Sequence, residues 1–301
     1  MNRRSSITVS LGVLLVLLSH GALRAQSTPW LPPEGELVTT PSYTFQTFDR
    51  FWFGSDKMDF PETDQQTVLA TLEYGILDDL TFDVTVGYSR TLGSRPGVGD
   101  EDGLADSKLG LRWRCLDEYR TDSEWAPSIA LRAGAIIEGT YEANLPESVG
   151  DGASGVEGSL LLGKTFYLES LGEIGFSGEV GMRARSEDVP DDFFFSVGAY
   201  KAFENGVSLS IAHRHNQGLS GPDIGDPGFS FPEVKEIQGN FEYGAAFRDE
   251  KFRSIGVYAA HTLYGRNTAE KLIIGLSVTV PFGVGSPVAD LFRGEPSGDE
   301  E

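Results

Sequence analysis

Apolar and polar side chains alternate along several segments of this chain with a period of two residues. From Thr81 to Tyr88, aromatic and valine side chains point one way, while threonine, aspartate and glycine point the other. The pattern recurs at 108–115, 173–185, 238–248 and 272–282. Successive side chains of a β-strand point to opposite faces, so each segment predicts a strand with one apolar face.

Weaker alternation extends this set to twelve predicted strands and therefore to an all-β chain. They span 37–52, 67–76, 80–91, 107–116, 126–139, 155–166, 171–185, 192–203, 207–217, 236–248, 252–264 and 271–282. In the first strand, Pro41 and a change of phase between Phe45 and Phe48 predict a bulge or an irregular start.

The first 25 residues have the layout of a secretory signal peptide. Arg3 and Arg4 supply positive charge, Ile7–Leu18 is mostly apolar, and Ala25 can end the peptide. Leu23 is unusual three positions before the cut, which leaves the cleavage site open. A transmembrane anchor is the alternative, but about 12 apolar residues are too few to cross a bilayer as a helix.

Every later apolar run is short and interrupted by polar residues, so no membrane helix is expected. A chain that crosses a membrane with strands must close into a barrel, because lipid offers no partners for backbone N–H and C=O groups. The strands therefore predict an antiparallel up-and-down transmembrane β-barrel with its apolar face toward lipid. A soluble β-sandwich is the alternative.

The predicted connections differ in length at the two strand ends. Those after the second, sixth, eighth and tenth strands are very short, whereas long connections rich in glycine, proline and acid span 54–66, 93–106, 140–154 and 218–235. This asymmetry is typical of bacterial outer-membrane barrels, with both termini in the periplasm. The cell outer membrane is therefore the expected location.

Aromatic residues also collect at the predicted strand ends, as expected at the two lipid–water boundaries. On the short-turn side lie Tyr74, Trp113, Trp125, Phe166, Tyr167, Tyr200, Phe203, Phe247, Phe252 and Phe282. On the long-loop side lie Phe51, Trp52, Phe53, Tyr88, Tyr141, Phe193 and Tyr264. A soluble sandwich does not require this sorting, so the barrel is the favoured fold.

The chain thus divides into a signal peptide (1–25), a periplasmic lead-in (26–36), a barrel (37–282) and an acidic periplasmic tail (283–301). A formal charge of −21 argues against nucleic acid as a partner. Cys115 is the only cysteine, which excludes an intramolecular disulfide. The expected partners are outer-membrane lipid, a small-molecule solute and the barrel assembly machinery.

The polar strand faces would line the interior of such a barrel. Twelve charged residues are predicted to line this lumen: Glu73, Asp83, Lys108, Arg112, Arg114, Arg132, Glu173, Glu179, Arg183, Arg185, Glu242 and Arg248. A charge in this position requires water or a partner. The set predicts ion pairs that brace the lumen, a passage whose charges set selectivity, or both. Twelve strands enclose room for small solutes only.

An outer-membrane lipid hydrolase is an alternative function. The segment His213-Arg214-His215-Asn216-Gln217-Gly218 is similar to the His-x-Ser-Asn-Gly type of motif in outer-membrane phospholipases and deacylases. A serine nucleophile needs a base within hydrogen-bond reach, but Gln217 stands where the motif requires serine. Ser210 and Ser220 lack the motif's spacing, so no catalytic residue is assigned.

Two acidic groups offer oxygen ligands that calcium prefers: Asp100, Glu101 and Asp102 with Asp106, and Asp223 with Asp226. Neither follows a recognised loop spacing. The sequence also contains no phosphate-cradling glycine motif and no dinucleotide fingerprint. Neither a metal site nor a cofactor is therefore expected.

Residues 72–82 resemble a Tyr-Gly-(Leu/Ile)-Thr-Asp-x-Leu hairpin, and residues 102–114 resemble a Gly-x-Gly-Asp-x-x-x-(x)-Lys-Tyr/Trp segment, with Ala105 replacing the second glycine. In these two segments the chain resembles a family of bacterial outer-membrane proteins named for the meta-cleavage pathway of phenol degradation. The resemblance implies an outer-membrane barrel that transports small hydrophobic or aromatic compounds, without identifying a binding residue. A structural or surface-interaction barrel with a sealed lumen is the other alternative.

Overall fold

The computed structural model describes residues 28–93, 100–143, 145, 148–169, 172–186 and 188–285, so the predicted signal peptide lies outside the described residues. The strands are β1 (Glu36–Phe53), β2 (Asp56–Leu77), β3 (Leu80–Gly93), β4 (Glu101–Leu104), β5 (Ser107–Leu116), β6 (Ser128–Ile137), β7 (Gly155–Leu168), β8 (Gly172–Arg185), β9 (Asp192–Ala202), β10 (Val207–Gly218), β11 (Ile237–Arg248), β12 (Ser254–Arg266) and β13 (Leu272–Gly283). A short 3-10 helix spans Glu118–Arg120. No helix in the described ranges is long and apolar enough to cross a membrane.

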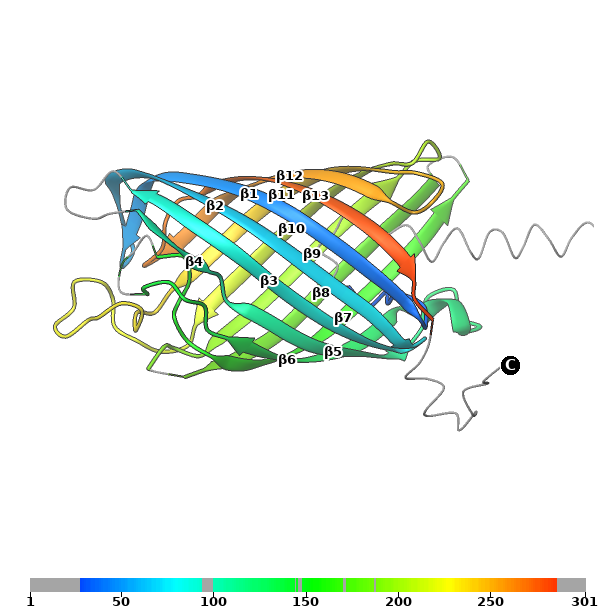
Figure 1. Cartoon of the computed structure of the whole chain (residues 1–301), viewed down its shortest axis with the longest axis horizontal. Helices are drawn as coiled ribbons and strands as arrows, with labels where there is room; N and C mark the ends of the chain where they lie inside the picture. The colour runs from blue at the N-terminus through cyan, green and yellow to red at the C-terminus, as the bar shows by residue number, and fades with distance from the viewer. Residues whose placement is uncertain are drawn as a thin grey trace, which may run out of the picture.

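All strands except β4 close into an antiparallel barrel (Figure 1). β1 pairs with β2 on one side and with β13 on the other, from Glu36↔Gly283 to Thr47↔Leu272. β3 pairs with β5 in the wall, while the short β4 lies beside the far half of β3. The predicted all-β, up-and-down barrel of twelve strands is confirmed.

The two ends of the barrel differ. The start of β1, the end of β13 and the short turns after β2, β7, β9 and β11 lie at one end, to the right in Figure 1. The connections 138–154 and 219–236 lie at the other end. We call these the turn end and the loop end.

Two predicted loops contain strand. The predicted connection 54–66 is wrong, because β2 begins at Asp56 after a turn at Gly54, whose φ of +59° suits glycine. Pro61 lies within β2 where the β1–β2 register shifts, so it interrupts no paired position. The predicted connection 93–106 likewise contains β4.

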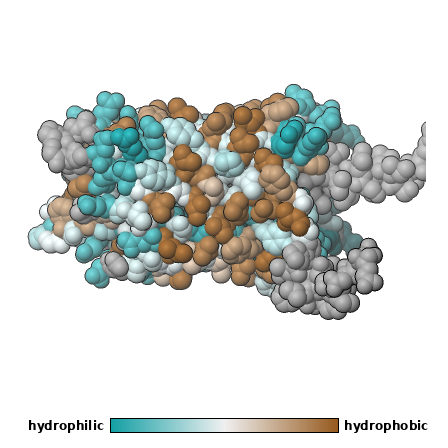
Figure 2. Space-filling view, in the orientation of Figure 1, coloured by the Kyte–Doolittle hydropathy of each residue, from teal (hydrophilic) through white to brown (hydrophobic). Residues whose placement is uncertain are grey.

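Exposed apolar side chains occur on strands all around the barrel, and Figure 2 shows the band that they form on one face. Predicted boundary aromatics are exposed at the turn end (Trp113, Trp125, Tyr167, Phe203, Phe247 and Phe282) and at the loop end (Tyr88 and Tyr264). Four others are buried, which corrects the prediction: Phe51, Trp52, Tyr141 and Tyr200. The first two pack near the β12–β13 turn, because the β1–β2 hairpin extends across the loop end.

Val86, near the middle of β3, tests which face meets lipid. It is 45% exposed on the apolar band. Val86→Arg should lower the free energy of unfolding in lipid vesicles by about 2–4 kcal/mol, because it places a charge in the hydrocarbon region. Val86→Ala is the matched control. Equal stability of the two variants in urea titrations would contradict a lipid-facing position.

Candidate functional site in the barrel lumen

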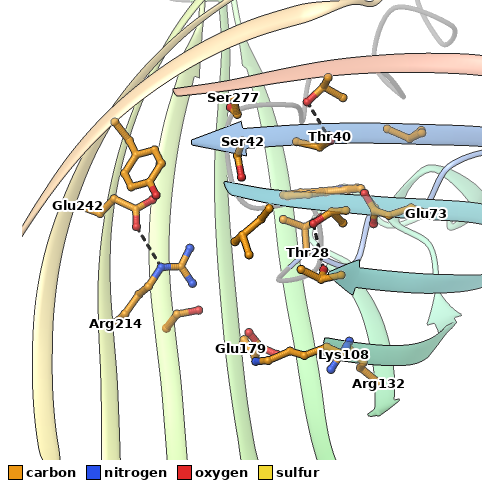
Figure 3. Close-up of a pocket in the computed structure, with 18 of the residues that line it drawn as sticks. Thr28, Thr40, Ser42, Glu73, Lys108, Arg132, Glu179, Arg214, Glu242 and Ser277 are labelled. Carbon is orange, nitrogen blue, oxygen red and sulfur yellow. Dashed lines mark hydrogen bonds and ion pairs between the residues drawn. The ribbon is translucent and has the colours of Figure 1, made fainter. Parts of the chain in front are cut away.

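The barrel encloses a cavity of about 550 Å³ (Figure 3). Its lining extends from Phe252 and Pro281 at the turn end to Asn216 and Gln238 near the loop end. Seven of the charged residues that the sequence places in the lumen line it: Glu73, Lys108, Arg132, Glu179, Arg183, Glu242 and Arg248. The polar strand faces thus surround a space large enough for a small molecule.

The other five residues of the predicted lining lie around this cavity. Asp83 and Arg112 are fully buried in the wall behind it. Arg114 pairs with Asp79 and Asp117 at the turn end. Two more bind neighbours instead: Glu173 accepts a 2.6 Å hydrogen bond from the Tyr200 hydroxyl, and Arg185 pairs with Asp151 and Asp192 at the loop end.

One wall of the lumen carries a network of ion pairs. Arg132 Nη2 lies 2.9 Å from Asp83 Oδ1, and Arg132 Nη1 also donates to Glu157. Arg112 donates to Glu73, and Arg183 Nε lies 3.2 Å from Glu157 Oε2. Since a buried charge is costly unless it is paired, these ion pairs offset part of the free energy that burying the side chains costs.

Gly110 leaves room for this network. It is an inward position of β5, between Lys108 and Arg112. A Cβ atom there would lie 2.6 Å from Arg132 Nη2 and 2.7 Å from Asp83 Oδ2, closer than side-chain atoms approach. A glycine between two charged positions on the same face of a strand is the sequence signal for such space. The sequence prediction did not use this signal.

The facing wall carries hydroxyl groups, which the sequence prediction missed. Six hydroxyl side chains line the cavity from three adjacent strands, β1, β12 and β13: Thr40, Ser42, Ser254, Tyr258, Ser277 and Thr279. Strand order sets β1 and β13 half a turn around the barrel from β7 and β8, which carry Glu157 and Glu179. The cavity therefore lies between an ion-paired wall and a neutral, hydroxyl-rich wall; Figure 3 labels Ser42 and Ser277 of the hydroxyl-rich wall and Glu179 of the ion-paired one.

Residues 28–35 lie inside the turn end of the barrel, and we call them the plug segment. Trp30 Nε1 donates to Glu118 Oε1 at 3.0 Å, and its ring meets Tyr200 edge to face at 6.2 Å between centroids. Arg112 Nη1 donates to the Thr28 carbonyl at 3.3 Å. The sequence predicted this stretch as a periplasmic lead-in, and composition alone gave no signal that it enters the lumen.

Glycines at inward positions make room for the plug segment. A Cβ atom on Gly75 would lie 2.0 Å from the Pro33 carbonyl oxygen, and one on Gly163 would lie 2.7 Å from Pro29 Cγ. These contacts come from β2 and β7, and those of Trp30 and Thr28 involve β9 and β5. These contacts of the plug segment thus involve β2, β5, β7 and β9, whereas β11, β12, β13 and β1 line the cavity along the rest of the ring.

The acidic groups considered as calcium ligands are engaged by other side chains. Arg90 pairs with Asp100 at 2.7 Å, and the Tyr141 hydroxyl donates to Asp106. Burial, together with this carboxylate, raises the pKa of Tyr141. Hydrogen bonds from Arg266 hold the pKa of Asp223 below its usual range. Among the described residues, no group of three or more potential ligands is placed to hold a metal ion.

The two histidines considered for lipid hydrolysis bond to other partners. His213 Nδ1 lies 3.0 Å from the Asn240 carbonyl oxygen, and His215 Nδ1 lies 3.0 Å from the Tyr264 hydroxyl. No serine hydroxyl bonds either imidazole in the part of the chain that the structure describes. The arrangement therefore lacks the nucleophile–base contact that serine catalysis uses.

Comparisons with known proteins bear on the fold. No protein-family model matches the sequence, and no curated protein matches it. The crystal structure of an outer membrane channel from Pseudomonas putida F1 aligns with a TM-score of 0.67 at 15% identity, covering 86% of this chain and 99% of that one.

Two further similar structures are LpxR from Salmonella typhimurium and the Pseudomonas putida toluene transporter TodX. LpxR has a TM-score of 0.49 at 9% identity and covers 80% of this chain and 99% of its own. TodX has a TM-score of 0.37 at 12% identity and covers 83% and 89%. At these TM-scores neither likeness bears on function.

Closure, the apolar band and the 0.67 alignment define the class: this chain has the fold of outer-membrane β-barrel proteins. That fold implies the location predicted from the sequence, the outer membrane. The signal peptide and membership of the phenol meta-pathway family stay predictions.

Proposed function

We propose that this barrel is a channel that passes small molecules across the outer membrane. The cavity along its lumen carries the proposal, because it reaches from the turn end to the loop half of the wall. Its volume of about 550 Å³ lies in the range of small-molecule sites. The ion pairs neutralise most charges of the wall, so a solute meets a polar surface of little net charge.

Small hydrophobic or aromatic compounds are the proposed substrates, because residues 72–82 and 102–114 resemble the phenol meta-pathway family. Apolar side chains in the cavity support this class: Trp30, Leu31, Val38, Leu69, Phe194 and Phe252. They provide surface against which an aromatic ring can pack. Outer-membrane lipid and the assembly machinery are the proposed partners of the barrel itself.

Two neighbouring residues on opposite faces of β13 provide the test. Ser277 lines the cavity, whereas Leu276 is 42% exposed on the apolar band. Ser277→Trp should reduce single-channel conductance and the swelling rate of arabinose-loaded liposomes at least severalfold, because the indole fills the lumen. Leu276→Trp is the matched control and should leave both unchanged.

Alternative functions give different outcomes in the same assay. The ion-paired wall also suits a structural barrel with a sealed lumen, for which neither protein nor variant would conduct ions or pass solutes. A lipid hydrolase would release fatty acid from outer-membrane lipid and lose that activity on His213→Ala or His215→Ala. Absence of conductance and flux in the wild-type chain would overturn the channel proposal.

A further inference from the structure

Arg248 differs from the other arginines of the lumen. Arg112, Arg132, Arg183 and Arg214 each form an ion pair with a carboxylate. Arg248 lines the cavity from β11 at the turn end and forms neither an ion pair nor a side-chain hydrogen bond within the described ranges. A guanidinium with five donors therefore faces the cavity without a protein acceptor.

Glu173 is the carboxylate that could have neutralised Arg248 from inside the turn end. Its two oxygens instead accept hydrogen bonds from the hydroxyls of Tyr200, at 2.6 Å, and Tyr167, at 2.9 Å. No ion pair joins Glu173 to Arg248 among the residues that the structure describes. Glu173 therefore acts on Arg248 only through space, and the N–H donors of the guanidinium are left for an acceptor that enters the cavity.

Hydroxyl groups adjoin Arg248 around the wall. Ser254 is its register partner on β12, and Thr279 is the register partner of Ser254 on β13. Both side chains line the cavity. Their hydroxyls can donate to an oxygen atom that the guanidinium holds, since a carboxylate accepts about four hydrogen bonds.

Apolar side chains complete this corner of the cavity. Phe252 lies in the turn directly after Arg248, and Pro281 follows Thr279 on the same face of β13. Leu31 of the plug segment lines the same cavity. A ring or short chain attached to a carboxylate would pack here while its oxygens bind the guanidinium, which pairs with carboxylates in a bidentate geometry.

We propose that Arg248, Ser254 and Thr279 form a binding subsite for the carboxylate of a small aromatic or aliphatic acid, at the turn end of the cavity. The inference deepens the proposed function and rests on it, since it names the charge of the transported compound. Arg248 would select anionic solutes from neutral ones of the same size. Phe252 would contribute to both classes through contact with the apolar part.

Equilibrium binding to the full chain in detergent tests the subsite, with benzoate and benzyl alcohol as probes in ligand-observed NMR titrations. Arg248→Gln should weaken benzoate binding at least about tenfold, since a charge-assisted bidentate pair is lost. It should weaken benzyl alcohol binding far less, because the alcohol carries no charge for the guanidinium to pair with. Phe252→Ala should weaken both probes, and Arg248→Lys should give an intermediate loss of benzoate.

The matched control is Arg253→Gln. Arg253 lies in the same turn, 55% exposed, and pairs with Asp249 outside the cavity lining. Arg253→Gln removes one positive charge from the turn end, as Arg248→Gln does. It therefore separates direct contact with benzoate from long-range attraction of the anion. Inorganic phosphate is added as a competitor, and displacement of benzoate by phosphate at equal concentration would indicate a general anion site and contradict carboxylate recognition.

The outcomes separate this inference from the channel proposal. If wild type and Arg248→Gln bind benzoate equally, or folded wild type does not bind it, the subsite is refuted whether or not the barrel conducts. If benzoate binding depends on Arg248 while liposomes show no flux, the subsite stands and the channel proposal fails.

Discussion

Arg112→Ala is expected to lower the free energy of unfolding by about 3–5 kcal/mol, because it leaves the buried Glu73 carboxylate without its cation and Asp83 with Arg132 alone. Arg112 is fully buried, donates to Glu73 and lies 3.8 Å from Asp83 Oδ2. Both acids are themselves almost inaccessible. Water cannot replace the guanidinium there without opening the wall, so Glu73 must take up a proton or remain unpaired.

Urea titration of the folded barrel in detergent, followed by the heat-modifiable gel shift, measures this change. Arg120→Ala is the control, because Arg120 is 51% exposed and pairs with Asp78 and Asp79 at the turn end. An exposed pair contributes about 0–1 kcal/mol. A similarly small loss for Arg112→Ala would show that the buried network does not support the fold.

A compensating variant distinguishes the charge from the packing. Arg112→Met combined with Glu73→Gln removes the cation and one of its anions together while keeping most of the buried volume. It should recover part of the lost stability, because replacing a whole buried pair by neutral groups is far less costly than breaking it. No recovery would assign the effect to lost packing of the long arginine side chain.

The barrel was predictable because each strand of its wall has one face toward lipid and one toward the lumen. In β3, alternation separates lipid-facing Phe82 and Val86 from inward Thr81 and Asp83, and no other strand is needed to read it. The outer part of the β1–β2 hairpin, predicted as the connection 54–66, was missed because this constraint does not act on it. It meets neither lipid nor the lumen, so Phe48, Phe51 and Phe60 pack on one another without strict alternation.

The lumen was predictable only as a set of charges. Alternation placed Arg132 of β6 and Asp83 of β3 on the inward faces of their strands. Which acid meets which base depends on the order of the strands and on the room that Gly110 leaves. The hydroxyl wall carries no charge to attract attention. The plug segment has no periodicity at all, and its position follows from contacts distant in sequence, such as Trp30 with Glu118.

The plug segment also occupies part of the lumen at the turn end and would narrow the proposed channel there, and Trp30 is its main anchor. The indole is 8% exposed, packs edge to face on Tyr200 and donates to Glu118. Trp30→Ala should cost about 3–5 kcal/mol of docking free energy, as for other buried tryptophans. The remaining anchors are hydrogen bonds such as that from Arg112 to the Thr28 carbonyl, each contributing about 0.5–1.5 kcal/mol.

A loss of that size exceeds what such hydrogen bonds supply, so the plug segment of Trp30→Ala should leave the lumen for most of the time. Single-channel conductance in planar bilayers should then rise severalfold and approach that of a variant lacking residues 28–33. Trp125→Ala is the control, because Trp125 lies at the same end but is 80% exposed. If both plug variants conduct as the wild type does, the limiting constriction lies between the ion-paired and hydroxyl walls instead.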